Sequence, residues 1–145
     1  MARIISIFLA LFIASASIAA PLERRQVQVS AACNEDRINI LTAVLESDAA
    51  VDKIDTSDDA TATAVGAAKL GLSSAGTGVK AILSAIIDGV NPPASGQTSV
   101  ELGLNTTRFA LAGITNPAVN STVAAAQAAV QTAIGAANDI IRDCN

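Results

Sequence analysis

The chain repeats apolar residues every three or four positions over most of its length, a spacing typical of amphipathic helices. The pattern predicts four helices joined by short polar segments. We expect the first helix from about Asn34 to Ile54, with Asn34 or Cys33 as its N-terminal cap. Its apolar stripe consists of Ile40, Val44, Val51 and Ile54.

The second predicted helix covers about residues 58–89 and begins after a polar turn. At its start, Thr56 and Asp59 have the spacing of a capping box. Gly76 and Gly78 would ordinarily indicate a break, but the apolar register continues through both glycines. That register consists of Val65, Ala68, Leu72, Ala75, Val79, Ile82 and Ile86. We therefore expect one long, kinked or thinned helix whose small residues allow close approach of a neighbour, with two shorter helices as the alternative.

A loop at residues 91–97 precedes the third predicted helix, which runs from about Thr98 to Ile114. Its polar stripe is narrow, and its apolar residues cover a wider arc than one side of a bundle requires. That polar stripe consists of Glu101, Asn105 and Arg108. The fourth helix is expected to begin at Asn116-Pro117, because proline suits the first helical position, and to continue to Cys144.

The N-terminal segment has a different pattern. A short basic start is followed by an almost wholly apolar run at residues 4–14 and then by small residues, which predicts a secretory signal peptide at residues 1–19. Residues 20–25 end in Arg24-Arg25, a dibasic pair that resembles a kexin-type processing site and predicts a short propeptide. A single helical domain at residues 26–145 is then expected outside the cell, free or associated with a cell wall.

Two cysteines lie near the ends of this domain, at Cys33 and Cys144, and in a secreted chain such a pair predicts a disulfide. Helices joined by short loops run antiparallel, so the two cysteines can meet only if the number of passes is even. Four passes satisfy this condition. We therefore expect an all-α, up-down-up-down four-helix bundle with one disulfide joining the first and last helices. Without a histidine or a second cysteine pair, a metal site at these cysteines is disfavoured.

The charge balance and the missing residue types disfavour several classes of function. The mature domain carries six basic and twelve acidic residues, a net charge of −6, which disfavours nucleic acid as a partner. The chain has no His, Trp or Tyr, so the commonest general base and the usual stacking platforms are missing. The C-terminus lacks the apolar tail of a GPI signal, and no transmembrane anchor is expected in the mature protein. We expect a non-enzymatic protein without a cofactor or a metal; the sequence leaves its oligomeric state open.

The remaining polar groups have ordinary structural interpretations. Asp88 and Glu101 flank one loop, but nothing near them in the sequence builds a sugar-binding cleft. Lys69 and Ser73 are four residues apart, a spacing that a solvated helix face also produces. The acidic residues at positions 48–59 lack the glycine and final glutamate of a calcium-binding loop, and capping carboxylates explain them better.

Two short motifs, Asn105-Thr106-Thr107 and Asn120-Ser121-Thr122, match the N-glycosylation acceptor. Both asparagines lie on polar stripes of the predicted helices. In a secreted chain, Asn105 and Asn120 are therefore candidate glycosylation sites.

The wide apolar arc of the third helix is the candidate binding feature, because large exposed apolar area commonly marks a binding site. The alternative is a central helix covered on both sides. The candidate ligand-binding residues are Leu102 and Phe109 on the third helix, with Leu72, Val79 and Ile82 opposite them on the second. Phe109 in an internal cavity would favour a lipid, Phe109 on an exposed patch would favour an apolar surface or a protein, and tight packing would weaken both hypotheses.

The leader ending in Ala20-Pro21-Leu22-Glu23-Arg24-Arg25, the Ala-, Val- and Thr-rich helical domain, the sequons and the lack of His together resemble fungal secreted, cell-wall-associated helical proteins. The chain is similar in composition and layout to the hydrophobic surface-binding protein A family and the related antigenic cell-wall galactomannoproteins. This resemblance implies adsorption to hydrophobic surfaces, or capture of a lipid or fatty acid between helices, and no catalytic residues. The alternative expectation is an effector-like or structural wall protein that recognises a protein partner.

Overall fold

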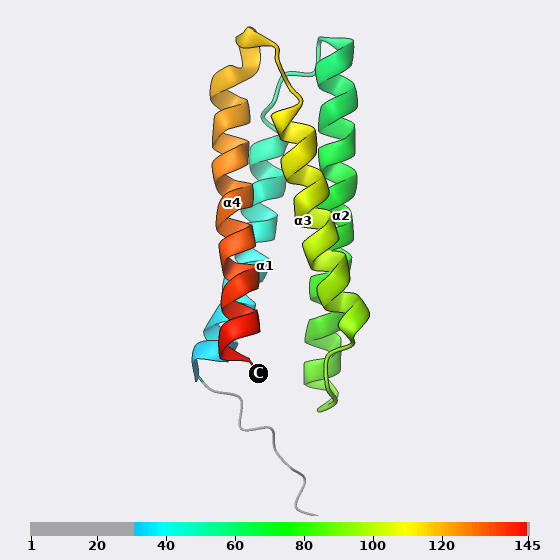
Figure 1. Cartoon of the computed structure of the whole chain (residues 1–145), viewed down its shortest axis with the longest axis vertical. Coiled ribbons are helices and arrows are strands. Elements are labelled where there is room, and N and C mark those ends of the chain that lie inside the picture. Colours follow the sequence, from blue (N-terminus) through cyan, green and yellow to red (C-terminus); the bar gives the residue numbers. More distant parts are fainter. Residues whose placement is uncertain (1–30, 145) are drawn as a thin grey trace, which may run out of the picture.

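The computed structural model describes residues 31–144, and the predicted signal peptide and propeptide lie outside them. These residues form the helices α1 (Ala31–Val51), α2 (Asp59–Ile87), α3 (Ala94–Ala112) and α4 (Asn120–Asp143), with a short 3-10 helix, η1 (Pro117–Val119), before α4. Consecutive helices alternate in direction, and no strand is present in the described part of the chain (Figure 1). The expected up-down-up-down four-helix bundle is confirmed.

The bundle consists of two closely packed helix pairs. α2 packs along α3, and α1 packs along α4, whereas the contacts of α1 with α2 and of α3 with α4 are sparser. The backbones of the diagonal helices, α1 with α3 and α2 with α4, do not approach each other closely. Figure 1 shows that both connections between the pairs lie at one end of the bundle, and that the pairs separate toward the opposite end.

α2 and α3 approach so closely because glycines of the two helices face each other. A Cβ at Gly71 would lie 2.6 Å from the Gly103 carbonyl oxygen, and a Cβ at Gly78 would lie 2.5 Å from the Gly96 carbonyl oxygen. Real side chains do not tolerate such distances from backbone atoms. The prediction of one long second helix with a closely packed neighbour is confirmed, and the alternative of two shorter helices is wrong. By length and apolar content alone α2 could also cross a membrane, as core helices of bundles often could.

A buried threonine adds a polar contact to the same interface. The Thr107 hydroxyl is fully buried and lies 3.1 Å from the carbonyl oxygen of Ala68 on α2 and 2.9 Å from that of Gly103 on its own helix. Because both oxygens are backbone acceptors, the hydroxyl is satisfied without a polar side-chain partner. Thr107 therefore joins α2 to α3 where no large side chain fits.

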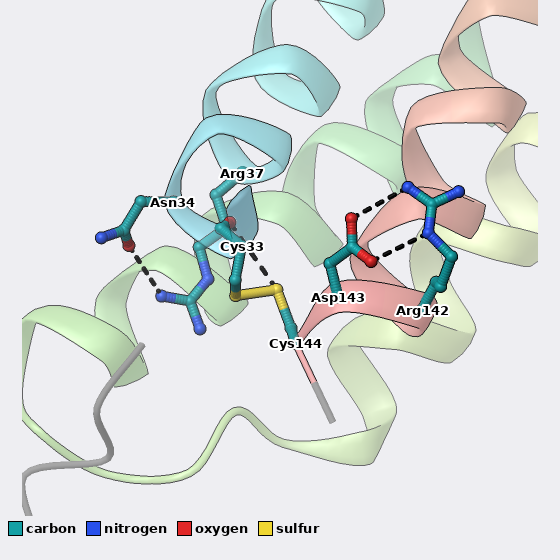
Figure 2. Close-up of a disulfide and its surroundings, with 6 residues drawn as sticks. All are labelled: Cys33, Asn34, Arg37, Arg142, Asp143 and Cys144. Atoms are coloured by element: carbon teal, nitrogen blue, oxygen red, sulfur yellow. Dashed lines mark hydrogen bonds and ion pairs between the residues drawn. A yellow bond between two sulfur atoms is a disulfide. The ribbon is translucent and has the colours of Figure 1, made fainter. Parts of the chain in front are cut away.

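α1 and α4 are joined by the predicted disulfide. Cys33 lies in the first turn of α1 and Cys144 directly follows α4, with their Cα atoms 5.0 Å apart (Figure 2). Away from the disulfide, α4 contributes small side chains that are completely buried: Ala126, Val130 and Ala133. The disulfide joins the first and last helices, as the sequence predicts.

The helix starts differ from the predicted ones for local reasons. α3 begins at Ala94 rather than Thr98, because Pro93 has an extended backbone and acts as the N-cap. The predicted capping box at Thr56 and Asp59 is wrong. Asp58 caps α2 instead, and its carboxylate accepts hydrogen bonds of 2.8 Å from both the backbone N–H and the hydroxyl of Thr61. The Asn116 side chain accepts a 3.0 Å hydrogen bond from the Ala118 N–H, so the predicted cap before the last helical segment is confirmed.

Candidate functional site

A cavity of about 380 Å³ lies between the two helix pairs, in the half of the bundle that contains the disulfide. All four helices contribute to its lining. Small-molecule sites in proteins have volumes of roughly 300–1,000 Å³, so this cavity is within the range of a ligand site. Its main apolar walls are formed by Ile40, Val79, Ile82, Leu104, Ile134 and Ile140.

The position of the cavity follows from the way the helices pair. The facing glycines draw α2 onto α3, and the disulfide holds α1 to α4, so the sparse contact falls between the pairs. Toward the connected end, completely buried side chains such as Val51 and Leu111 fill the interior. Toward the other end, Ala94 and Ala137 line the space with small side chains and leave room.

Polar groups also line the cavity, and they come from α1, α3 and α4. They are Arg37, Gln97, Thr98, Glu101, Asn105 and Asn138. The Arg37 side chain is half-buried, and its Nη1 donates a 3.3 Å hydrogen bond to the Asn34 side-chain oxygen (Figure 2). The cavity thus combines an apolar interior with charged and amide groups, an arrangement that suits an amphiphilic ligand.

The five predicted ligand-binding residues are not brought together. Val79 and Ile82 line the cavity, and both are buried. Leu72 is buried in the core but does not line the cavity. Leu102 and Phe109 lie on the outer face of α3, 61% and 67% exposed.

Phe109 is exposed because the inner face of α3 is occupied by smaller groups. Gly103 and Thr107 fill the contact with α2, where a phenyl ring could not fit. The Arg108 guanidinium lies 4.9 Å from the centre of the Phe109 ring, a cation–π contact at the surface. By the criterion stated for Phe109, this exposure favours a surface or protein partner for the outer face of α3.

Most residues of the cavity walls were not among the predicted ligand-binding residues. They include Ile40, Leu104, Ile134 and Ile140. Periodicity marks Ile40 and Ile140 as inward-facing, but it does not distinguish a tightly packed position from one beside a space. Glu101, Asn105 and Arg108 were assigned to one polar stripe, yet only Glu101 and Asn105 line the cavity. No sequence signal separates these cases without knowledge of which helices pair.

The two sequon asparagines lie in different surroundings. Asn105 is half-buried and lines the cavity, whereas Asn120 is exposed at the first residue of α4. A glycan on Asn105 would therefore begin at the cavity, and one on Asn120 would project from the connected end of the bundle. Both asparagines stay candidate glycosylation sites.

A cluster of acidic residues borders the disulfide. Asp36 on α1 is about nine-tenths buried, and its Oδ2 has no hydrogen-bond partner in the described chain. Burial raises the pKa of Asp36, and the nearby carboxylates of Asp143 and Asp139 on α4 raise it further. Arg142 forms ion pairs of 2.8 Å with both α4 carboxylates. Its contact with Asp143, which Figure 2 shows, lowers the pKa of Asp143. Within residues 31–144, no group of acidic or cysteine side chains is placed to hold a metal ion.

Fold and site together define a small, disulfide-closed helical bundle with a mainly apolar cavity. Comparison with known proteins finds no match to a family model, a curated protein or a solved structure. Function is therefore inferred from the geometry of the molecule.

Proposed function

We propose that the protein is a non-enzymatic binder of lipid-like ligands, whose apolar part occupies the cavity between the two helix pairs. The cavity itself carries the proposal: about 380 Å³ with apolar walls from all four helices. Each methylene moved from water into such a site contributes about 0.8 kcal/mol. Eight methylenes would therefore contribute about 6 kcal/mol before the cost of association.

The charged groups support binding rather than catalysis. Lys69, a candidate basic partner for Ser73, instead forms an ion pair with Asp52, which directly follows α1. This contact raises the pKa of Lys69, whereas a lysine acting as a base needs a lowered pKa. Asp88 is exposed at the C-terminal cap of α2 and does not line the cavity with Glu101.

The disulfide and the leader support a location outside the cell. Cross-links such as Cys33–Cys144 persist mainly in oxidising compartments. The leader pattern of residues 1–25 and the resemblance to fungal wall-associated proteins extend the proposal to the cell wall or exterior of a fungus.

A substitution that fills the cavity with a large side chain tests whether the cavity is the binding site. In Ala137→Phe, a phenyl ring would occupy the space between the pairs, and a fluorescent acyl-chain probe should bind about tenfold more weakly or not at all. Ala128→Phe, on the exposed face of the same helix, is the matched control and should bind like wild type. Circular dichroism verifies that both variants stay helical. Equal probe binding by the two folded variants would refute the cavity as the site.

A second candidate is adsorption to apolar surfaces through the outer face of α3. The exposed Leu102 and Phe109 are seven positions apart, so they lie on the same side of the helix. The double variant Leu102→Ser/Phe109→Ser should adsorb less to octyl-coated beads, while Leu45→Ser, an equally exposed site on α1, should not. Identical adsorption of both variants and wild type would remove this candidate.

A further inference from the structure

The cavity is lined by one positive and one negative side chain from opposite corners of the bundle. Arg37 comes from α1 and Glu101 from α3, two diagonal helices whose backbones do not approach each other closely. Neither side chain forms an ion pair within the described part of the chain; the ion pairs there involve Lys69 and Arg142. The polar lining therefore offers two separate, uncompensated charges of opposite sign.

Arg37 is half-buried and Glu101 is exposed, so a head group that lies beside them displaces part of their water, and a charge that loses water without gaining a partner destabilises the complex. A carboxylate or phosphate monoanion would pair with Arg37 but would bring a second negative charge toward Glu101. The net charge of −6 on the mature domain also opposes an anionic ligand. A neutral head group would leave both side chains without a counter-charge. A zwitterion supplies a partner to each.

We propose that the ligand is a single-chain amphiphile with a zwitterionic head group of the phosphocholine class; this inference rests on the proposed function. The phosphate accepts hydrogen bonds from the Arg37 guanidinium, whose fork geometry matches phosphate oxygens. The quaternary ammonium lies against the Glu101 carboxylate. The acyl chain packs among the apolar walls, including Val79, Ile82 and Ile134.

Arg37 can take this role because, within residues 31–144, one long hydrogen bond to the side chain of Asn34 is all that holds its guanidinium. Breaking that bond costs little, since Asn34 is exposed and water replaces the donor. The amides of Gln97, Asn105 and Asn138 can donate to the ester and phosphate oxygens of the same ligand.

The test compares three ligands with the same dodecanoyl chain below their micellar concentrations: lysophosphatidylcholine, monoacylglycerol and the free fatty acid. Isothermal titration calorimetry uses the mature, disulfide-bonded protein. We expect lysophosphatidylcholine to bind about tenfold more tightly than either other ligand. Glycerophosphocholine, which has the head group without the chain, should show no measurable binding.

Two variants that each remove one charge then test whether Arg37 and Glu101 bind the head group. Arg37→Gln and Glu101→Gln should each reduce lysophosphatidylcholine affinity about five- to tenfold and leave monoacylglycerol affinity unchanged. Arg108→Gln removes an exposed charge outside the cavity on the same helix as Glu101 and should change neither affinity. Arg37→Lys keeps the charge but loses the fork, and should retain part of the preference.

Other results would overturn the inference. One such result is that the fatty acid binds more tightly than the other two ligands, and that its affinity falls in Arg37→Gln and rises in Glu101→Gln. This result would indicate an anion site. Equal affinity for all three ligands would remove the role of the two charges and leave the proposed function intact. Tight binding of glycerophosphocholine, which has no acyl chain, would show that the protein binds the head group without the chain. No binding of any acyl ligand would overturn the proposed function and this inference together.

Discussion

The two helix pairs of the bundle are held together by different physical means. α2 and α3 touch through facing glycines, so their contact depends on the absence of side chains. α4 packs along α1 with small, completely buried side chains of its own, and a covalent bond joins the two helices at one end. Both devices stabilise contacts within a pair, and neither acts between the pairs. The cavity therefore lies between the pairs, at the end where no loop connects one pair to the other.

Removing the disulfide should produce the largest loss of stability. Cys33 and Cys144 are 111 positions apart, and cross-linking a loop of that order stabilises a protein by about 4–5 kcal/mol in the chain-entropy model. The double variant Cys33→Ser/Cys144→Ser should therefore unfold at a much lower guanidinium concentration. Equilibrium denaturation followed by circular dichroism measures the change.

Hydrogen exchange sharpens this prediction into a comparison between the pairs. Without the disulfide, the first turns of α1 and the last turns of α4 should lose protection first, because the bond lies between those ends. The glycine contacts of α2 with α3 are intact in this variant. Equal loss of protection along α2 and α3 would contradict the description of two separately stabilised pairs.

Adding a single methyl group to the α2–α3 contact should lower the stability of the protein. In Gly103→Ala, the new Cβ would lie 2.5 Å from the Gly71 carbonyl oxygen, and neither backbone can move away without separating the helices. Overpacking of this kind costs about 1–3 kcal/mol, and the upper end is expected here because the contact is with backbone. Thermal and guanidinium denaturation of the disulfide-bonded protein measure the loss.

Gly66→Ala is the matched control on α2, because a Cβ at Gly66 would meet nothing within 4 Å. There, alanine should stabilise the helix by about 0.5–1 kcal/mol through its higher helix propensity. The two variants make the same chemical change with opposite expected signs. The same sign for both would mean that the α2–α3 contact is looser than the structure describes.

These glycines also mark the limit of what the sequence can predict. The three-four spacing of apolar residues identifies the helices, and the two cysteines then fix an even number of passes, so the bundle was predictable. The spacing does not show how near a neighbouring helix lies. Gly103 and Thr107 interrupt the apolar arc of α3, yet they form its closest contact with α2. Phe109 was a candidate because it belongs to that apolar arc, and the size of its ring excludes it from the face that contacts α2.

The cavity was unpredictable for the same reason. Val79 and Ile82 belong to the apolar register of α2, and the register identified them correctly as inward-facing. Whether an inward-facing residue meets a neighbour or a space depends on the separation of the helix pairs. That separation is set by Gly71 and Gly103 in one pair and by the disulfide in the other. Such a balance involves all four helices at once, and no local pattern encodes it.

Thr107→Val should moderately lower the stability of the protein by weakening the α2–α3 contact. The substitution keeps the branched shape but removes the hydroxyl that contacts the Ala68 carbonyl oxygen at 3.1 Å. Loss of a buried hydrogen bond typically costs about 1 kcal/mol, and the Ala68 carbonyl oxygen, which loses this donor, adds to the cost. Thr106→Val, at the exposed neighbouring position, provides the control for denaturation experiments. A neutral effect at position 107 would mean that packing alone holds the pair.

The smallest expected effect concerns the α1–α4 pair and depends on pH. The pKa of Asp36 is raised in the folded protein, first by burial and then by Asp143 and Asp139, so the folded state binds a proton more tightly than the unfolded chain does. The resulting stabilisation is complete below the ordinary value of 3.8 and is lost as the pH rises through the raised pKa. Arg142 opposes this shift, so it reduces the effect without reversing it.

Asp36→Asn isolates this contribution. At pH 7 the variant should melt at a higher temperature than wild type, because an amide replaces a buried carboxylate beside two others and can donate to one of them. As the pH falls toward 4, wild type should gain stability and the difference should shrink. The lowered pKa of Asp143 affects stability only at more acidic pH, since its contribution is lost as the pH falls below 3.8. Glu46→Gln, which removes a carboxylate at an exposed position of α1, is the matched control. A pH-independent difference for Asp36→Asn would mean that its carboxyl keeps contact with water and that the α1–α4 pair is open at the disulfide end.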